Sequence, residues 1–416
     1  MAGRLSEGSD PDPWRGHYAA RTAGLSASEV RALFAVASRP EVVSLAGGMP
    51  FVSALPLDLV TTAVERTLRE RGDAALQYGS GQGVPVLREQ ILEVMALEGI
   101  HGRADDVVVT TGSQHALELL AKLFLDPGDI VLAEGPSYVT ALVVFRSFQA
   151  DVSHVTMDEH GVVPEALRER IAALAAEGRK PKLIYTVPTF NNPAGVTLSS
   201  RRRVEILQIA REHDILVIED NPYGLLYFGA PPPDPLRSIA DDGIVYLGTF
   251  SKTLAPGLRV GWALAPPGIR DKLILANEAA ILSPSSFTQL VVSEYLHTAD
   301  WRAQIATFRG VYQERRDALL AALAEFLPNL TWTVPDGGFY VWLSLPNELD
   351  SSAMLPRAVV ELVAYTPGSA FYADGNGHHN IRLSFSYPNP EFIREGVRRL
   401  AMVIEAETRL AAAGAT

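Results

Sequence analysis

The sequence predicts an α/β fold with a mostly parallel central sheet covered by helices, and with a smaller α+β domain. Between residues 105 and 265, short apolar runs rich in β-branched residues alternate with helix-like stretches. Strands that are apolar along almost their whole length indicate a sheet buried on both faces, and the alternation with helices indicates parallel connections. The chain of 416 residues exceeds what one hydrophobic core usually serves, so two subdomains are expected.

The expected elements follow a regular order along the chain. Apolar runs predict strands, and longer amphipathic stretches predict helices. The strands are expected at 106–111, 129–133, 182–187, 215–219, 244–248 and 259–265, and the helices at 114–124, 164–176 and 200–213.

The two ends of the chain differ from this middle part. Ser26 and Glu29 fit a capping box, which predicts a helix that ends near Pro40. After residue 290 the chain becomes helical and charged, with short strands near 338–343 and 381–386 and an amphipathic helix over 390–411. We therefore expect three parts: an N-terminal arm and helix (1–50), a large domain (51–290) and a small C-terminal domain (291–416).

Composition and charge argue against several classes of protein. The sequence has no cysteine, which excludes disulfides, thiolate–zinc sites and cysteine nucleophiles, and its nine histidines form no metal-binding motif. A net charge of −12 disfavours nucleic acid and anionic membranes as partners. No apolar run reaches the ~18–20 residues of a membrane span, and the N-terminus lacks the apolar region of a signal peptide. A cytoplasmic enzyme without a metal is expected.

A strand predicted to end near Thr111 runs through Gly112 directly into a helix. Gly112 permits a tight turn, and Ser113 is expected to be the N-cap of the helix. The first N–H groups of such a helix can bind a phosphate. The geometry of a strand–helix turn explains the glycine and the serine equally well, so this signal is weak when taken alone.

The strongest candidate for a nucleophile is Lys252. Thr249 and Ser251 place hydroxyl groups three residues and one residue before it, and Arg259 follows seven residues later. This pattern gathers phosphate ligands around an amine that could form an imine. Because the amine must react as the neutral base, we expect its pKa to be lowered.

Two further turns offer polar groups at the expected carboxyl ends of strands. Asp220 could pair with a protonated pyridine nitrogen, and Tyr223 could reach a phenolic oxygen. Asn192, before Pro193, could present its amide to the same oxygen. For Glu219 we expect no role beyond beginning a turn.

Together these motifs resemble the class I/II aminotransferases, which are pyridoxal 5′-phosphate (PLP) enzymes of fold type I. The matching motifs are Gly112-Ser113-Gln114, Pro136-Ser-Tyr138, Asn192-Pro-x-Gly, Asp220-x-x-Tyr223, Ser251-Lys252, Arg259 and Arg382 in Ile-Arg-Leu-Ser. Their order and spacing over about 275 residues are hard to obtain by chance. The stretches 44–50, 76–79, 110–114, 124–128, 246–252 and 255–259 are most similar to the 2-aminoadipate/kynurenine aminotransferase branch.

The resemblance implies roles for individual residues. It implies that three residues are catalytic: Lys252 forms the Schiff base and moves a proton, Asp220 pairs with the ring nitrogen, and Tyr138 stacks on the ring. For the other contacts to the cofactor it implies Asn192 and Tyr223 at the phenolic oxygen, and around the phosphate Gly112, Ser113, Gln114, Thr249, Ser251, Arg259 and, from a second subunit, Tyr78. A homodimer is therefore implied. For the substrate it implies Arg382 as the clamp on the α-carboxylate, with Gly48 and Asn192 in the same pocket.

The implied function is transfer of an amino group from an L-amino acid to a 2-oxo acid, with glutamate and 2-oxoglutarate as one pair. The other partner could be of 2-aminoadipate, kynurenine, aromatic or branched-chain type. Arg31 stands where 2-aminoadipate aminotransferases recognise an acidic side chain, although an ordinary exposed helix arginine explains it equally well.

Two other functions use the same scaffold. A PLP-dependent β-lyase or decarboxylase is the nearer alternative, and Arg382 favours transamination over decarboxylation because it retains the carboxylate. The more remote alternative is a non-enzymatic regulator that binds an effector. The arm before the aminotransferase-like region is too short and not basic enough for a DNA reader.

Overall fold

The computed structural model describes residues 12–24 and 41–414. The predicted capping box at Ser26 and Glu29, the helix that follows it, and Arg31 lie outside the described residues. Within these ranges, no helix is both long and apolar enough to cross a membrane.

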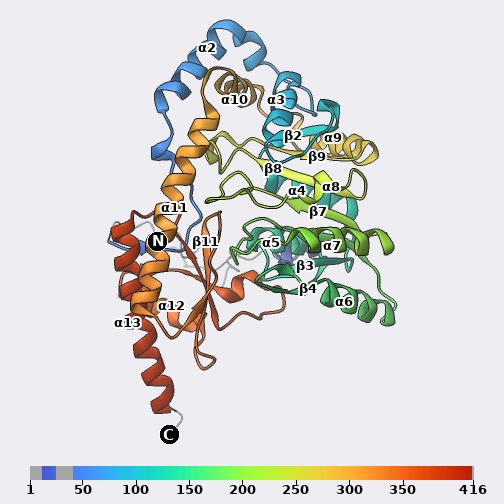
Figure 1. Cartoon of the computed structure of the whole chain (residues 1–416). Coiled ribbons are helices and arrows are strands. Elements are labelled where there is room, and N and C mark those ends of the chain that lie inside the picture. Colours follow the sequence, from blue (N-terminus) through green and yellow to red (C-terminus); the bar gives the residue numbers. More distant parts are fainter. Residues whose placement is uncertain (1–11, 25–40, 415–416) are drawn as a thin grey trace, which may run out of the picture.

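An eight-stranded sheet forms the centre of the molecule (Figure 1). Its strand order is β2-β9-β8-β7-β6-β3-β4-β5. Pairing is parallel from β4 through β3, β6 and β7 to β8, whereas β9 is antiparallel to both of its neighbours and β5 is antiparallel to β4. The strands are β2 Val107–Thr110, β3 Ile130–Gly135, β4 Asp151–Asp158, β5 Gly161–Val162, β6 Pro181–Thr186, β7 Leu216–Asp220, β8 Ile244–Thr249 and β9 Gly261–Leu264.

Helices cover both faces of this sheet because consecutive strand residues point to opposite sides. Val131 and Leu183 pack with α4 Ser113–Phe124, α5 Val139–Ser147 and α9 Pro267–Ile281. Their sequence neighbours Leu132 and Ile184 pack with α6 Pro164–Ala176, α7 Ser200–Glu212 and α8 Leu236–Ile239. The α/β prediction is therefore confirmed.

The C-terminal part is built on a four-stranded antiparallel sheet of order β10-β11-β14-β13. A separate parallel pair, β1 with β12, brings residues 43–44 against residues 363–364. In Figure 1 the long helix α11 runs from the level of α10 down to this region. The elements are β1 Val43–Ser44, β10 Thr331–Trp332, β11 Tyr340–Ser344, β12 Val363–Ala364, β13 Thr366–Pro367, β14 Asn380–Ser384, α11 Trp301–Phe326, α12 Ser351–Val360 and α13 Pro390–Gly414.

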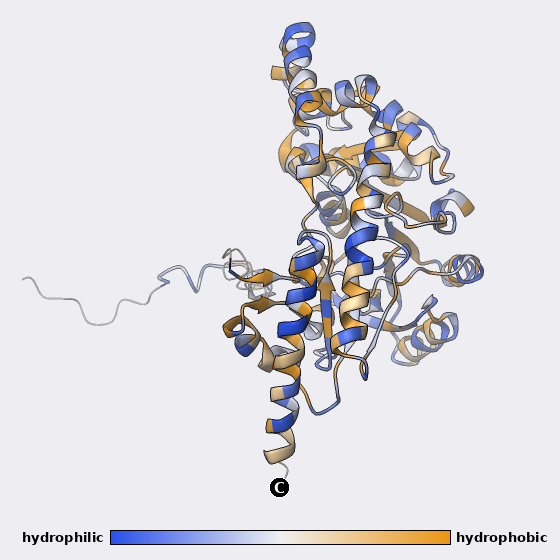
Figure 2. Ribbon diagram, turned by 60° about the vertical axis from the view of Figure 1, so that its left-hand side comes forward, coloured by the Kyte–Doolittle hydropathy of each residue, from blue (hydrophilic) through white to orange (hydrophobic). Residues whose placement is uncertain are grey.

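The remaining elements of the described residues are helices and short turns. Hydrophilic and hydrophobic residues mix along α13, as in a helix with one buried side (Figure 2). The proposed boundary at residue 290 falls within α10, and the division into domains stays a prediction. These elements are α2 Leu57–Leu76, α3 Pro85–Ala96, α10 Ser286–Thr298 and the short 3-10 turns Ala20–Gly24, Val52–Ala54, Ala104–Asp106, Pro256–Leu258 and Gly368–Phe371.

Candidate active site

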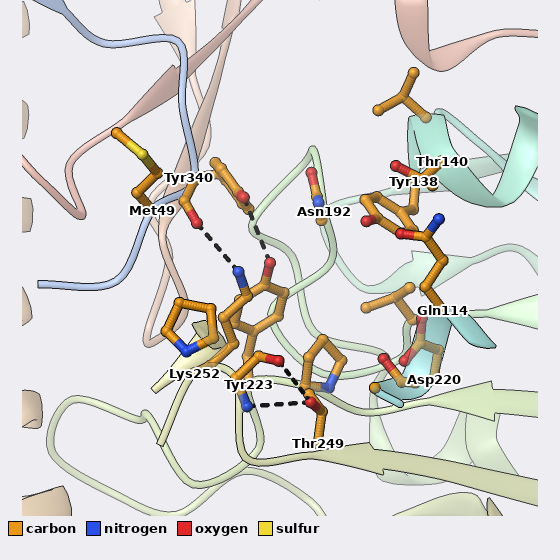
Figure 3. A pocket seen from close by; sticks show the side chains of 18 of the residues that line it. Met49, Gln114, Tyr138, Thr140, Asn192, Asp220, Tyr223, Thr249, Lys252 and Tyr340 are labelled. Carbon is orange, nitrogen blue, oxygen red and sulfur yellow. Dashed lines mark hydrogen bonds between the residues drawn. The ribbon is translucent and has the colours of Figure 1, made fainter. Parts of the chain in front are cut away.

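A cavity of about 330 Å³ lies at the carboxyl ends of β6, β7 and β8, against the start of α4. Of the predicted site residues that the structure describes, all line it except Tyr78 (Figure 3). The lining also includes Met49, Thr140 and Tyr340, for which no role was predicted. The residues that line it are Gly48, Met49, Gly112, Ser113, Gln114, Tyr138, Val139, Thr140, Val187, Asn192, Asp220, Pro222, Tyr223, Thr249, Ser251, Lys252, Pro256, Arg259, Tyr340 and Arg382.

Lys252 follows β8 and directs its amine into the cavity (Figure 3). Its Nζ donates to the carbonyl oxygen of Gly48 at 3.1 Å. Burial and the nearby guanidinium groups of Arg382 and Arg259 lower the pKa of this amine to about 8. A larger fraction of the amine is therefore neutral near physiological pH than for an ordinary lysine, as an imine-forming nucleophile requires.

Asp220 ends β7 with a buried carboxylate that is only half satisfied. Its Oδ2 accepts from the hydroxyl of Tyr185 at 2.9 Å, whereas Oδ1 has no hydrogen-bond partner within the part of the chain that the structure describes. Burial raises the pKa of Asp220 to about 6, against the opposing effects of Tyr185 and Lys252. A buried acceptor without a partner is costly, so this oxygen fits a ligand that brings a proton donor, such as a pyridinium nitrogen.

The turn before α4 is shaped for an anion. Gly112 has φ of 96° and is itself the N-cap of α4, so the helix begins at Ser113. The prediction that Ser113 is the N-cap was wrong by one residue, because the turn uses a positive φ that glycine adopts far more readily than serine. The N–H groups of Ser113 and Gln114 belong to the first helical turn, which lacks intrahelical acceptors.

Residues from the loop after β8 complete this anion site, which we call the phosphate cradle. Arg259 donates from NH2 to the carbonyl of Thr111 at 2.8 Å, and Thr249 Oγ1 donates to Ser251 Oγ at 2.9 Å. A Cβ on Gly261 would lie 2.6 Å from the backbone of Gly112 and Ser113, so glycine there lets the two segments touch. These groups fit the phosphate of a cofactor, with Arg259 supplying positive charge.

A second cationic group lies across the cavity. Arg382, on β14, is 4% exposed and donates to Asn192 Oδ1 at 2.9 Å, Ala46 O at 2.6 Å and Thr366 Oγ1 at 3.2 Å. Its guanidinium carbon lies 4.3 Å from the ring centroid of Tyr340. No carboxylate pairs with it among the described residues, and its Nε has no hydrogen-bond partner there. A buried guanidinium in this state fits an anionic ligand.

The remaining predicted residues close the cavity. Tyr223 is 2% exposed and its hydroxyl donates to that of Tyr340 at 3.4 Å. Burial raises the pKa of Tyr138 to about 12, so its phenol stays protonated. A Cβ on Gly48 would lie 1.7 Å from the hydroxyl of Tyr340, so only glycine fits this approach. Figure 3 shows that Tyr223, Lys252 and Tyr340 point toward one another.

Three residues differ in outcome from the rest: one prediction is untested, one was wrong, and one residue was missed. Tyr78 is 79% exposed and does not line the cavity, so its contact with a second subunit stays a prediction. Glu219 does not begin a turn: it is fully buried within β7, and its carboxylate accepts from the N–H groups of Leu236 and Arg237, both at 2.8 Å. Tyr185 was missed because it lies within a mostly apolar strand and no motif surrounds it.

The fold and this cavity together define a PLP-binding site of fold type I. The sequence profile described as Aminotransferase class I and II matches residues 42–400. The chain is 38% identical over 94% of its length to the Aromatic-amino-acid aminotransferase 1 of Thermococcus litoralis, covering 95% of that protein. It is 36% identical over 95% of its length to the 2-aminoadipate transaminase of Thermus thermophilus, covering 98% of that protein.

Comparison with solved structures also identifies an aminotransferase. A kynurenine aminotransferase from Pyrococcus horikoshii superposes with a TM-score of 0.91 at 38% identity, over 95% of this chain and 98% of that one. The chain therefore belongs to the aminotransferase class I and II family. It is a PLP-dependent aminotransferase.

Proposed function

We propose that this aminotransferase moves the amino group of an L-amino acid to a 2-oxo acid, with glutamate and 2-oxoglutarate as one pair. The observation that carries the proposal is Arg382. A buried guanidinium without a carboxylate partner among the described residues suits the α-carboxylate that every amino acid and 2-oxo acid shares. Holding this carboxylate through the reaction suits transamination rather than decarboxylation.

The other residues would share the work around the cofactor. Bound PLP supplies an aldehyde for the amino group and a protonated ring that withdraws electrons. Asp220 would keep the ring nitrogen protonated through its free oxygen, and Asn192 and Tyr223 would hold the phenolic oxygen. Lys252 would bind the aldehyde and, once displaced by the substrate amine, take up and return the proton of the substrate Cα. Tyr138 would restrict the ring to one plane.

For the substrate side chain we propose two kinds of partner. Met49, Val139 and Tyr340 offer apolar contact to aromatic or branched side chains. Besides Arg382, the cationic side chains that line the cavity within the described ranges are Lys252 and Arg259, which the cofactor would engage. We therefore propose that Arg31 reads acidic side chains such as those of glutamate and 2-aminoadipate, in keeping with the name of the Thermus thermophilus relative.

A panel of L-amino acids tests these proposals. We expect glutamate, 2-aminoadipate and an aromatic amino acid to convert the PLP form to the pyridoxamine form, which absorbance follows in single-turnover mixing. Arg31→Ala should slow only the acidic donors, by about tenfold or more, since one charge-assisted contact is lost. Arg21→Ala, which removes an exposed arginine of the same N-terminal region, is the matched control and should change nothing. An unchanged glutamate rate in Arg31→Ala would refute the role of Arg31. Release of pyruvate and ammonia without an oxo acid would instead indicate a lyase.

We further propose a homodimer in which Tyr78 reaches the phosphate site of the partner. Leu68, Leu76 and Tyr78, on α2 and just after it, are exposed apolar side chains in one chain. Sedimentation equilibrium should give a mass of twice 45.0 kDa. Tyr78→Phe should keep that mass but release PLP more readily on dilution, whereas a monomer or an unaltered PLP affinity would contradict the proposal.

A further inference from the structure

The two turns that carry the polar groups of the site are built in the same way. Asn191 follows β6, and its Oδ1 accepts from the backbone N–H of Ala194, three residues later, at 2.9 Å. Asn221 follows β7, and its Oδ1 accepts from the backbone N–H of Gly224, also three residues later, at 3.0 Å. Each asparagine therefore closes its own turn through its side chain.

Each asparagine also donates its amide to a glutamate from a distant part of the chain. Asn191 Nδ2 donates to Glu134 Oε2 at 2.7 Å, and Asn221 Nδ2 donates to Glu98 Oε1 at 2.8 Å. Glu134 lies on β3, and Glu98 follows α3. Neither glutamate lines the cavity.

Donors surround the carboxylate of Glu134, which is 3% exposed. It accepts from the hydroxyl of Thr186 at 2.6 Å and from the N–H of Val187 at 2.9 Å, in addition to Asn191. Val187 begins the segment that leads to Asn191, so one carboxylate holds both ends of this segment. Two of these three donors are N–H groups that need an acceptor, whereas the hydroxyl of Thr186 can also accept.

Glu98 is held closely against the second turn. Its Oε2 accepts from the hydroxyl of Tyr246 at 3.3 Å. A Cβ on Gly224 would lie 1.7 Å from its Oε1, so glycine lets the turn close against the carboxylate. The two glutamates thus hold the turns that follow the neighbouring strands β6 and β7, and both lie earlier in the sequence than these turns.

Arg203 links the electrostatics of both pairs. This fully buried arginine on α7 donates to the carbonyls of Pro188 and Leu198 and to Thr189 Oγ1, all in the segment after β6. Burial raises the pKa of both Glu98 and Glu134 to about 7, and Arg203 opposes that rise. The glutamates are thus placed where only hydrogen bonds and one shared cation compensate for burial.

The residues next to these asparagines are those of the site. Asn192 adjoins Asn191 and accepts from Arg382 at 2.9 Å. Asp220 adjoins Asn221, and Tyr223 follows two residues after it. A shift of Asn191 would therefore move the contact to Arg382, whereas a shift of Asn221 would move the carboxylate of Asp220, which is proposed to pair with the ring nitrogen of the cofactor.

We propose that Glu134 and Glu98 are positioning residues for transamination: Glu134 sets the carboxylate clamp through Asn191, and Glu98 sets Asp220 and Tyr223 through Asn221. The inference rests on the roles proposed above for Asn192, Asp220 and Tyr223. It assigns two separable effects, one on substrate binding and one on the electronic state of the bound cofactor.

Leucine and glutamine variants of the PLP-bound enzyme test the proposal. Glu134→Leu should raise the KM for glutamate by on the order of tenfold, with a smaller change in kcat, because small displacements of binding groups have effects of this size or larger. Glu98→Leu should lower kcat and move the pH at which the absorbance of the bound cofactor changes. Glu134→Gln and Glu98→Gln should stay close to wild type, because each amide can still accept from asparagine and can donate to the Thr186 or Tyr246 hydroxyl.

Glu219→Gln is the matched control. Glu219 is fully buried, adjoins Asp220 and lies 3.8 Å from the same Arg203, but its carboxylate accepts from the start of α8 rather than from a turn of the site. This variant should lower the Tm and leave KM, kcat and the absorbance profile unchanged. The same kinetic shift in Glu219→Gln, or glutamine variants as impaired as the leucine variants, would overturn the proposal.

Two further readouts keep the test decisive. Where a leucine variant does not yield folded protein, Asn191→Ala or Asn221→Ala removes the same hydrogen bond from the other partner and carries the same expectation. Leucine or alanine variants with wild-type KM, kcat and absorbance profile would also overturn it. A wild-type enzyme that binds PLP but does not use glutamate would defeat the proposed substrate, while the absorbance profile of Glu98→Leu would still decide the positioning role.

Discussion

Lys252→Ala is expected to abolish nearly all turnover while the protein still binds PLP. The proton transfers at the substrate Cα would lose their general base and acid, which alone accounts for roughly 10²–10⁴-fold in rate. The cradle formed by the start of α4, Thr249, Ser251 and Arg259 stays intact in this variant, so the phosphate contacts remain. Single-turnover mixing with glutamate measures the rate, and equilibrium dialysis measures the retained PLP.

A matched control separates this effect from the loss of any lysine. Lys272 is exposed on α9, and Lys272→Ala should behave as wild type. Because the pKa of Lys252 is lowered to about 8, the neutral fraction of its amine should rise as the pH increases through that value. Attachment of PLP to the apoprotein should accelerate over the same interval. Normal turnover in Lys252→Ala would overturn the assignment of the whole site.

Asp220→Asn is expected to have the next largest effect. Replacing the carboxylate leaves the ring nitrogen without its negative partner, and removal of one such electrostatic contact typically costs about 10²–10³-fold in kcat. Tyr185→Phe is the matched control, because it removes the 2.9 Å hydrogen bond to Oδ2 but keeps the charge. Its effect on kcat should be much smaller. Equal losses in the two variants would mean that the charge of Asp220 is not what matters.

Asp220→Asn should also stabilise the apoprotein. Burial raises the pKa of Asp220 from 3.8 to about 6, so the folded chain binds a proton more tightly than the unfolded chain does. The ionised carboxylate therefore destabilises the fold fully above about pH 6, and this cost disappears as the pH falls toward 3.8. Thermal melts without PLP should thus show a higher Tm for Asp220→Asn than for wild type at pH 8, and equal values in acid.

The sequence was most informative where a motif and an element coincide. The strand–helix turn at Gly112, the lysine after β8 and the polar groups after β6 and β7 could all be located, because apolar runs mark the strands and the functional residues follow them directly. One position was predicted wrongly: Gly112, and not Ser113, is the N-cap of α4.

Features that depend on distant contacts were missed for physical reasons. The strand β4 has polar residues and a mixed burial pattern near the edge of the sheet, so no apolar run marks it. Tyr340 enters the cavity from β11, more than a hundred residues beyond Tyr223, and no local spacing connects the two. Glu134 likewise acts through Asn191, which only the parallel arrangement of β3 and β6 brings within reach.

The short segment around β1 contacts two of the cationic groups of the site and pairs with the C-terminal strand β12. Arg382 donates to Ala46 O at 2.6 Å, Lys252 donates to Gly48 O at 3.1 Å, and Leu45 N donates to Ala364 O at 2.8 Å. This segment precedes the turn at Gly112 and the loops after β6, β7 and β8 by more than sixty residues. The lining residues Gly48 and Met49 are thus encoded apart from Thr249, Ser251 and Arg259. We therefore expect that variation confined to a handful of codons before residue 50 can adjust the substrate pocket while the residues proposed to hold the cofactor are inherited unchanged.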